Sequence, residues 1–207
     1  MSAGRLTRKE RQQHTRSCLL EAAGRVFARR GLAQASVDEV AADAGFTKGA
    51  VYANFGSKDE LFLEMLDAKF ALRLAEMDRA LSTGEAPEAQ ARAAGRDFVD
   101  QLNLDPEWAR LFFEAGLHAS RDDAFREKLT ARYAAMRERM AELLRRRAQD
   151  GGFDPGVPFE QVATMVFAMA NGVAFERLVE PAAVPDDLFA SMLELFTLGA
   201  ASRQPLP

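Results

Sequence analysis

Apolar residues recur along most of the chain at the three- and four-residue spacing of an α-helix, not at the alternating spacing of a β-strand. The clearest stripe, in residues 58–81, consists of Phe62, Leu66, Phe70, Leu74, Met77 and Leu81. Similar stripes predict helices over residues 7–30, 87–104, 106–120 and 122–149. No segment forms a convincing strand, so we predict an all-α protein.

Two short helices are predicted between the first helix and the one that begins at Lys58. Ser36 and Glu39 form a capping box for the first short helix, and Gly45 ends it in a tight turn. Thr47 caps the second, and Gly56 ends it. Two short helices joined by a glycine turn and preceded by a longer helix are typical of a helix-turn-helix.

The last two predicted helices, residues 158–180 and 186–201, are apolar on nearly all sides. A helix of this kind needs cover on every face. A second copy of the chain can cover one surface, since two such helices per chain build a four-helix interface with two-fold symmetry. We therefore expect a homodimer through these helices; the alternative is an ordinary buried core.

The charge distribution is uneven. Residues 1–36 contain eight basic and two acidic residues, whereas the whole chain has a net charge of −4. A basic start on an acidic body indicates that the first segment meets a polyanion. The alternative is a solvated helix with arginines on its wet face.

The composition of the chain indicates in which cellular compartment the protein is expected. No run approaches 18 uninterrupted apolar residues, so we expect no membrane span. The basic N-terminus has no apolar segment behind it, and the single cysteine, Cys18, fits a reducing compartment. A cytoplasmic protein is expected.

The second short helix carries the chemistry that suits DNA. Recognition helices use their N-terminal residues on base edges and phosphates. Here that end offers Thr47 and Lys48, followed by Gly49, which adds no bulk against the groove. Tyr52 lies one turn on, with a hydroxyl that can reach a phosphate, and Asn54 is by type a reader of adenine. The helix starts at Ser36 and Lys58 are suited to phosphate.

The stretch "SVDEVAADAGFTKGAVYANFGSKDELF", preceded by "LLEAAGRVFARRG", resembles the DNA-binding domain of the TetR family of bacterial transcriptional regulators. The resemblance is close over residues 12–66 and extends to the rest only in helical layout. It implies a DNA-binding domain in residues 1–57 and an effector-binding and dimerisation domain in residues 58–207, with nine helices in all. The residues expected at DNA are Ser36, Val37, Thr47, Lys48, Gly49, Tyr52, Asn54 and Lys58.

The resemblance also implies a palindromic double-stranded operator, a homodimer through the last two helices and a cavity for a small apolar or amphipathic effector. Basic residues Arg5, Arg8, Lys9 and Arg11 are expected to form an arm along phosphates or a minor groove. The pocket residues we select are Phe98, Trp108, Phe112, Met136, Met140 and Phe167, although most such residues in a bundle belong to its core.

Two other function classes remain as alternatives. An enzyme is disfavoured, because the sequence has no phosphate-binding glycine loop and no zinc-ligand spacing, and we expect no cofactor and no metal. A helical adaptor that binds protein through a Met-rich surface is the second alternative, but it does not account for the recognition-helix pattern.

Overall fold

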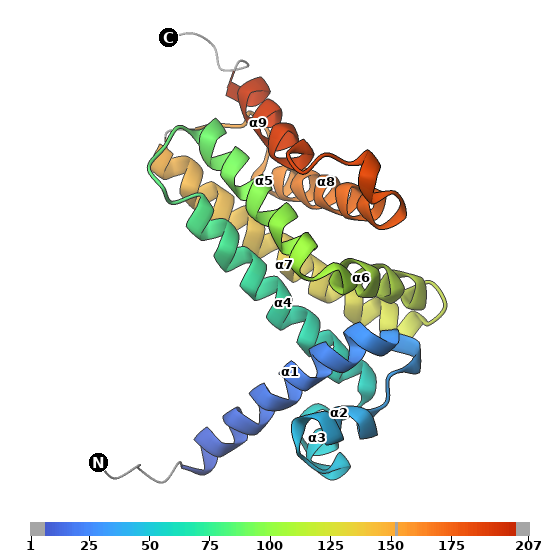
Figure 1. The fold of residues 1–207 in the computed structure, drawn as a ribbon. Coiled ribbons are helices and arrows are strands. Elements are labelled where there is room, and N and C mark those ends of the chain that lie inside the picture. Colours follow the sequence, from blue (N-terminus) through green and yellow to red (C-terminus); the bar gives the residue numbers. More distant parts are fainter. Residues whose placement is uncertain (1–6, 152, 202–207) are drawn as a thin grey trace, which may run out of the picture. The chain divides into compact units, whose positions relative to one another are not determined.

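The computed structural model describes residues 7–151 and 153–201, and these residues form α-helices with one short 3₁₀ turn (Figure 1). In chain order the elements are α1 (Arg8–Gln34), α2 (Val37–Ala44), α3 (Lys48–Phe55), α4 (Lys58–Ala80), α5 (Pro87–Leu104), α6 (Pro106–Ala119), α7 (Asp123–Gly151), α8 (Phe159–Val179), η1 (Pro181–Ala183) and α9 (Leu188–Ala201). The all-α prediction is confirmed, and within the described residues so are the nine helices.

The predicted helix ends agree with the structure to within a few residues, with one instructive exception. Gly31 has φ 76° and ψ 166°, so it interrupts α1 directly after residue 30, where the predicted helix ends, but the chain then makes one further turn to Gln34. Gly45 ends α2 at φ 72°, in the left-handed region that favours glycine. Both short helices are therefore bounded by the local signals in their own sequence.

The chain divides into two compact units. The first takes in α1, α2, α3, the start of α4 through Ala68, and Leu111–Leu129. Its core centres on Phe27 and Phe62, whose rings meet edge to face with centroids 5.3 Å apart, and Phe62 also contacts Phe125 at 6.1 Å. All three rings are buried, and together they tie α1, α4 and α7.

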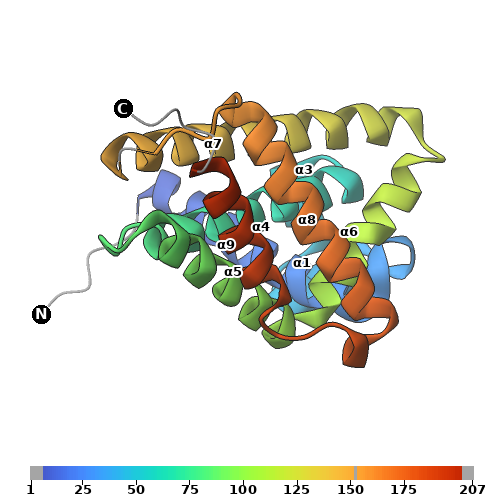
Figure 2. The same cartoon turned by 90° about the horizontal axis from the view of Figure 1, so that it is seen from above.

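The second unit consists of Lys69–Arg110 and the chain from Thr130 onward. Here α9 packs on α5 and beside α8, as the view from above shows (Figure 2). Val99, Val173, Phe189 and Leu193 form its buried centre. The division predicted from sequence, at residues 57 and 58, concerns function and stays a prediction.

A close contact between two helices of the second unit is made at Gly95 of α5. A Cβ atom at this position would lie 2.5 Å from the Cα of Ala190 and 2.8 Å from its nitrogen. Ala190 is itself fully buried. Only glycine therefore allows the α5 and α9 backbones to approach this closely.

Candidate DNA-binding helix and ligand cavity

Side-chain caps set the three helices that surround the candidate DNA-binding surface. The Ser36 hydroxyl accepts a hydrogen bond from the Glu39 amide at 3.2 Å, and the Glu39 carboxylate accepts one from the Ser36 amide at 3.0 Å. The bond from the Ser36 amide, together with one that the Ser36 hydroxyl donates to the same carboxylate at 3.0 Å, lowers the pKa of Glu39. Thr7 and Glu10 make the same reciprocal pair at the start of α1, and the Thr47 hydroxyl caps α3 through the Ala50 amide.

Helix α3 is held by its second half and exposed at its first. Val51 and Phe55 are buried, whereas Thr47, Lys48 and Gly49 are exposed and Tyr52 is 46% exposed. Apart from Thr47 Oγ1 at 3.8 Å, nothing lies within 4 Å of the position that a Cβ would take on Gly49. Packing within the protein therefore does not require glycine at position 49. Close approach to an external surface would require it.

Lys48 is the cation of this exposed end. Its ammonium lies 2.9 Å from the Asp38 carboxylate of α2, and this hydrogen bond raises the pKa of Lys48. Both side chains are more than half exposed, so the ion pair is weak and an incoming phosphate can replace the carboxylate. The structure thus places Lys48 beside Thr47 on the outer face of the predicted helix-turn-helix.

Arg16, which the sequence analysis did not select, fixes the other end of α3. Its Nη1 donates to the Asn54 carbonyl at 2.6 Å, its guanidinium pairs with Glu64 of α4, and its charge lies 4.5 Å from the centre of the Phe55 ring. A cation at a helix C-terminus is favourable. In the sequence, Arg16 is notable only because it lies off the apolar face of the first helix. That position does not identify Asn54, 38 residues away, as its partner.

Two residues expected to contact DNA, Asn54 and Val37, are not fully exposed in this structure. Asn54 Nδ2 donates to the Ala50 carbonyl at 2.7 Å, and its Oδ1 is buried without a hydrogen-bond partner among the described residues. The expected adenine contact stays a prediction, and it requires the amide to leave the Ala50 carbonyl. Val37 is only 6% exposed and belongs to the core, so its side chain is not available to DNA as expected.

Lys58 has a different local role from the one expected. Its ammonium donates to the carbonyls of Leu32, Ala33 and Ala35 at 3.0–3.2 Å, which occupies all three of its N–H bonds. A phosphate contact by Lys58 requires one of these bonds to break. The Glu114 carboxylate accepts from the Leu32 amide at 2.8 Å, so two charged side chains hold the backbone between α1 and α2.

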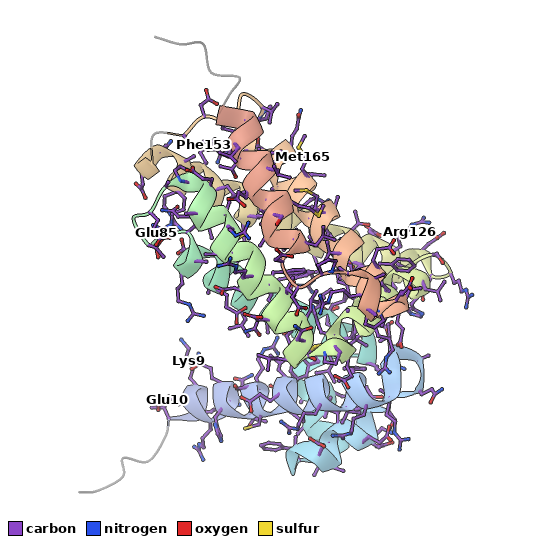
Figure 3. All side chains as sticks on the ribbon, turned by 45° about the horizontal axis from the view of Figure 1, so that its top comes forward. Lys9, Glu10, Glu85, Arg126, Phe153 and Met165 are labelled. Atoms are coloured by element: carbon purple, nitrogen blue, oxygen red, sulfur yellow. The ribbon has the colours of Figure 1, made fainter. Side chains whose placement is uncertain are left out.

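Carboxylates of α2 neutralise part of the basic N-terminal segment. Asp43 pairs with both Arg25 and Arg29, at 2.7 and 2.9 Å, and Glu39 pairs with Arg30 at 3.0 Å. Arg8, Lys9 and Arg11 are exposed on the first turn of α1, with Lys9 marked in Figure 3. The expected basic arm is thus helical from Arg8, and Arg5 lies outside the described residues.

The second unit contains a cavity of about 580 Å³, within the range of small-molecule sites. The ends of α4, α7 and α9 and the starts of α5 and α8 enclose it, with Phe153 and Glu85, both marked in Figure 3, in its wall. Its apolar lining includes Met77, Leu81, Phe153, Phe159 and Phe196. Its charged side chains are Glu85, Arg147 and Asp150.

None of the six pocket residues selected from sequence lines this cavity. Phe98 packs on Phe189 with ring centroids 4.8 Å apart, and Met136 is buried. Trp108 and Phe167 meet the Phe70 ring edge to face at 6.4 and 6.5 Å. Met136 is therefore part of the core, whereas Phe98, Trp108 and Phe167 are half-buried. Phe112 and Met140 also lie outside this cavity wall, and a ligand role for the six residues stays a prediction.

The faces of α8 and α9 carry large apolar side chains that the chain itself does not cover. Phe175 is 49% exposed, Val179 65% and Leu195 68%. Met165, Leu178, Leu188 and Leu198 are also exposed, and Met165 is marked in Figure 3. The prediction that these helices need cover from outside agrees with this exposure.

By length and composition alone, α8 also qualifies as a membrane span, and it is the only one in the part of the chain that the structure describes. Its best window has a mean hydropathy of 1.4 and is 28% buried. A single helix of this kind is weak evidence, since helices that pack in protein interiors and interfaces pass the same test. The expectation of no membrane span stays a prediction.

A metal site finds no support in the described residues, where no three His, Cys, Asp or Glu side chains gather in one place. Cys18 Sγ lies 3.8 Å from Nε2 of His14 on the same face of α1, without further ligands there.

Comparisons with known proteins fit this geometry. The family model for bacterial regulatory proteins of the tetR family matches residues 19–65, and that for the C-terminal part of BetI-type transcriptional repressors matches residues 87–197. The HTH-type transcriptional regulator YfiR of Bacillus subtilis, itself uncharacterized, is 27% identical over 80% of each chain.

Two solved structures share the fold at 18% identity. A TetR-family transcriptional regulator from Rhodococcus sp. has a TM-score of 0.76 and covers 91% of this chain and 99% of its own. The regulator FadR of Bacillus subtilis, solved in complex with stearoyl-CoA, has a TM-score of 0.68 and covers 88% of this chain and 98% of its own.

Proposed function

The chain belongs to the TetR family of bacterial transcriptional regulators and is a DNA-binding regulator; from this premise we propose that it is a homodimeric repressor, released from a palindromic operator by a small ligand. The observation that carries the proposal is the position of α3, buried through Val51 and Phe55 and exposed at Thr47, Lys48 and Gly49. The adaptor alternative is not favoured by these comparisons. The absence of enzymatic activity stays a prediction.

In the proposed complex the N-terminal half of α3 enters the major groove. Thr47 and Lys48 contact base edges or phosphates, and the Tyr52 hydroxyl reaches a phosphate from one turn further on. Gly49 lets the helix backbone approach the groove closely. The start of α2 contributes backbone N–H groups from Val37 onward to phosphate, since the Ser36 N–H donates to the Glu39 carboxylate.

A homodimer through α8 and α9 explains the exposed apolar faces of these helices. The α3 helices of the two subunits then enter successive major grooves, about 34 Å apart or somewhat more. Because the dimer has two-fold symmetry, the operator is palindromic. A dimer that forms without detergent also removes the need for a membrane to cover α8. In dilute buffer without detergent, we expect analytical ultracentrifugation to show a dimer for the wild type and a monomer for the double variant Phe175→Glu/Leu195→Glu. A monomeric wild type, or a protein that stays in solution only with detergent, would contradict the proposed interface.

The repressor role follows from the matched C-terminal family, whose description names repressors. The ligand role rests on the 580 Å³ cavity and on the stearoyl-CoA bound by FadR, a protein of the same fold. A ligand shifts the equilibrium only if it binds the released state better than the DNA-bound state. The regulator is expected to act in the cytoplasm, where its DNA is.

The test uses a duplex selected by the wild-type protein from a random DNA pool. Fluorescence anisotropy should show affinity that falls steeply as salt rises. Lys48→Ala and Tyr52→Ala should each weaken binding about tenfold or more, since each loss is repeated in both subunits of the dimer. Arg126→Ala is the matched control, because this exposed arginine lies on α7. Unchanged affinity in both α3 variants would falsify the docking, and transcription that rises when the protein is added would contradict repression.

A further inference from the structure

The charged groups at the cavity of the second unit do not balance. The guanidinium of Arg147 lies 2.6 Å from Asp78 through Nη2, and its Nε donates to the same carboxylate at 2.8 Å. This short, two-point contact satisfies the positive charge with a residue outside the cavity wall. Asp150 is 3.7 Å from Arg147 Nη1, a longer and weaker contact.

Glu85 adds a second carboxylate on the same wall. It lies in the connection between α4 and α5, where only its backbone carbonyl has a described partner, the Gln90 side chain at 2.9 Å. Its side chain is exposed, so it stands where the cavity opens to solvent. Asp78, Glu85 and Asp150 carry three negative charges. Arg147, and Arg146 with its Nη2 3.4 Å from Asp78, carry two positive ones, so the group has a net charge of −1.

The rest of the wall is apolar and aromatic. Phe153, Phe159 and Phe196 line the cavity together with Met77, and each of these four side chains is half-buried. Aromatic faces attract a cation that has shed part of its water, and thioethers adapt to apolar bodies of varied shape. The same wall offers no unpaired cation, because Arg147 is held by Asp78.

We infer that this cavity takes an amphipathic cation, with an apolar body among the aromatic side chains and its positive charge towards Glu85 and Asp150. The inference rests on the proposed ligand role of the cavity and specifies its ligand class. A carboxylate of the same size meets net negative charge at the mouth and should bind less well. An uncharged analogue should fall between the two, because it gains only the burial of its apolar body.

Three probes with one ten-carbon chain test the charge preference by calorimetry on the full-length protein: decyltrimethylammonium, decanol and decanoate, each below its micelle concentration. We expect affinity to fall in that order. Glu85→Gln and Asp150→Asn should each weaken the cation about two- to fivefold, since exposed pairs contribute little, and should leave decanol unchanged. Glu88→Gln, a loss of the same charge on α5 outside the cavity wall, should change none of the three.

Two further variants locate the site and test the sign. Ala94→Leu places a larger side chain in the cavity wall and should weaken all three probes, provided its melting curve shows a folded protein. Arg147→Gln removes a positive charge from the cavity wall, leaves Asp78 with only the longer Arg146 contact at 3.4 Å, and should strengthen binding of the cation. Stronger binding of decanoate, no change in Glu85→Gln/Asp150→Asn, or unchanged binding in Ala94→Leu each overturns the inference.

The same experiments distinguish a failure of the inferred ligand class from a failure of the proposed release of DNA by a ligand. If the cation binds with the expected variant effects but does not lower the anisotropy of the DNA complex, the charge preference stands and release by this ligand fails. If decanoate instead binds best and releases DNA, the ligand-released repressor stands and the inferred ligand class is wrong.

Discussion

The two compact units use different means to define their helices. In the first, α1, α2 and α3 each begin with a side-chain hydrogen bond, from Thr7, Ser36 and Thr47. In the second, α5 follows Ala86 and α8 follows Pro158, and neither start has a side-chain cap. Short-range polar bonds thus fix the helix starts of the first unit, whereas the starts of α5 and α8 depend on how the helices pack.

The difference suits the two proposed tasks. A DNA-reading surface requires a fixed geometry, and caps, together with Arg16 at the far end of α3, supply it. A ligand site requires space and adaptable walls, and packing among five helix ends leaves a cavity lined by flexible and aromatic side chains. Substitutions that remove a side-chain cap and substitutions that alter helix packing should therefore change the free energy of unfolding by unequal amounts in the two units.

The largest expected effect is at the core of the first unit. Phe62→Ala removes a fully buried ring that contacts both Phe27 and Phe125, and should lower the free energy of unfolding by about 3–5 kcal/mol. Phe196→Ala, in a wall that already borders a cavity, should cost clearly less. Urea unfolding followed by circular dichroism compares them; equal losses would remove the distinction between a dense core and a wall.

Next in size is the close approach of α5 to α9. Gly95→Ala forces a methyl group against the Ala190 backbone, where no side chain can rotate away, and should cost about 1–3 kcal/mol. Gly116→Ala, on α6 with open space around its Cβ position, serves as the matched control and should not destabilise. Indistinguishable melting temperatures of the two variants would show that the helices separate at little cost.

Loss of a cap should have a smaller effect. Ser36→Ala should cost about 1 kcal/mol and loosen the start of α2. Because the capping box lowers the pKa of Glu39, its contribution is complete above 4.5, the ordinary pKa of that carboxyl, and is lost as pH falls through the lower folded value.

The difference in unfolding free energy between wild type and Ser36→Ala should therefore narrow in acid. Denaturant titrations at pH 7 and at pH 3 measure it. Because Ser36→Ala keeps the backbone N–H bond to Glu39, a difference that is the same at both pH values would mean that the bond from the Ser36 hydroxyl to the Glu39 carboxylate adds nothing to stability.

The same contrast explains what the sequence could predict. Ser36 with Glu39, Gly45 and Thr47 act on backbone within four residues, so their roles were predictable from local order. Arg16, Lys58 and Glu114 bind backbone 38, 26 and 82 residues away, and nothing near them in sequence names these partners. The sequence therefore predicts a phosphate contact for Lys58, whereas in the structure its ammonium donates to carbonyls at the end of α1.

The cavity was harder still to predict. A cavity is the space that packed side chains leave unfilled, so it depends on small displacements of several helices rather than on residue type. Aromatic residues such as Phe98 and Trp108 look alike in sequence whether they fill a core or line a site. The charged wall residues Glu85 and Asp150 carry no periodic signal at all.

The smallest change in stability gives the most direct test of the central claim, that the start of α3 lies against DNA. Alanine is favoured over glycine in a helix by about 0.5–1 kcal/mol, and the protein itself leaves room for the methyl group at Gly49. Melting temperature and operator affinity are measured together for Gly49→Ala, with Gly116→Ala as the control. The account predicts that both variants are at least as stable as wild type and that only Gly49→Ala loses operator affinity, about tenfold; full affinity in a stabilised Gly49→Ala would contradict it.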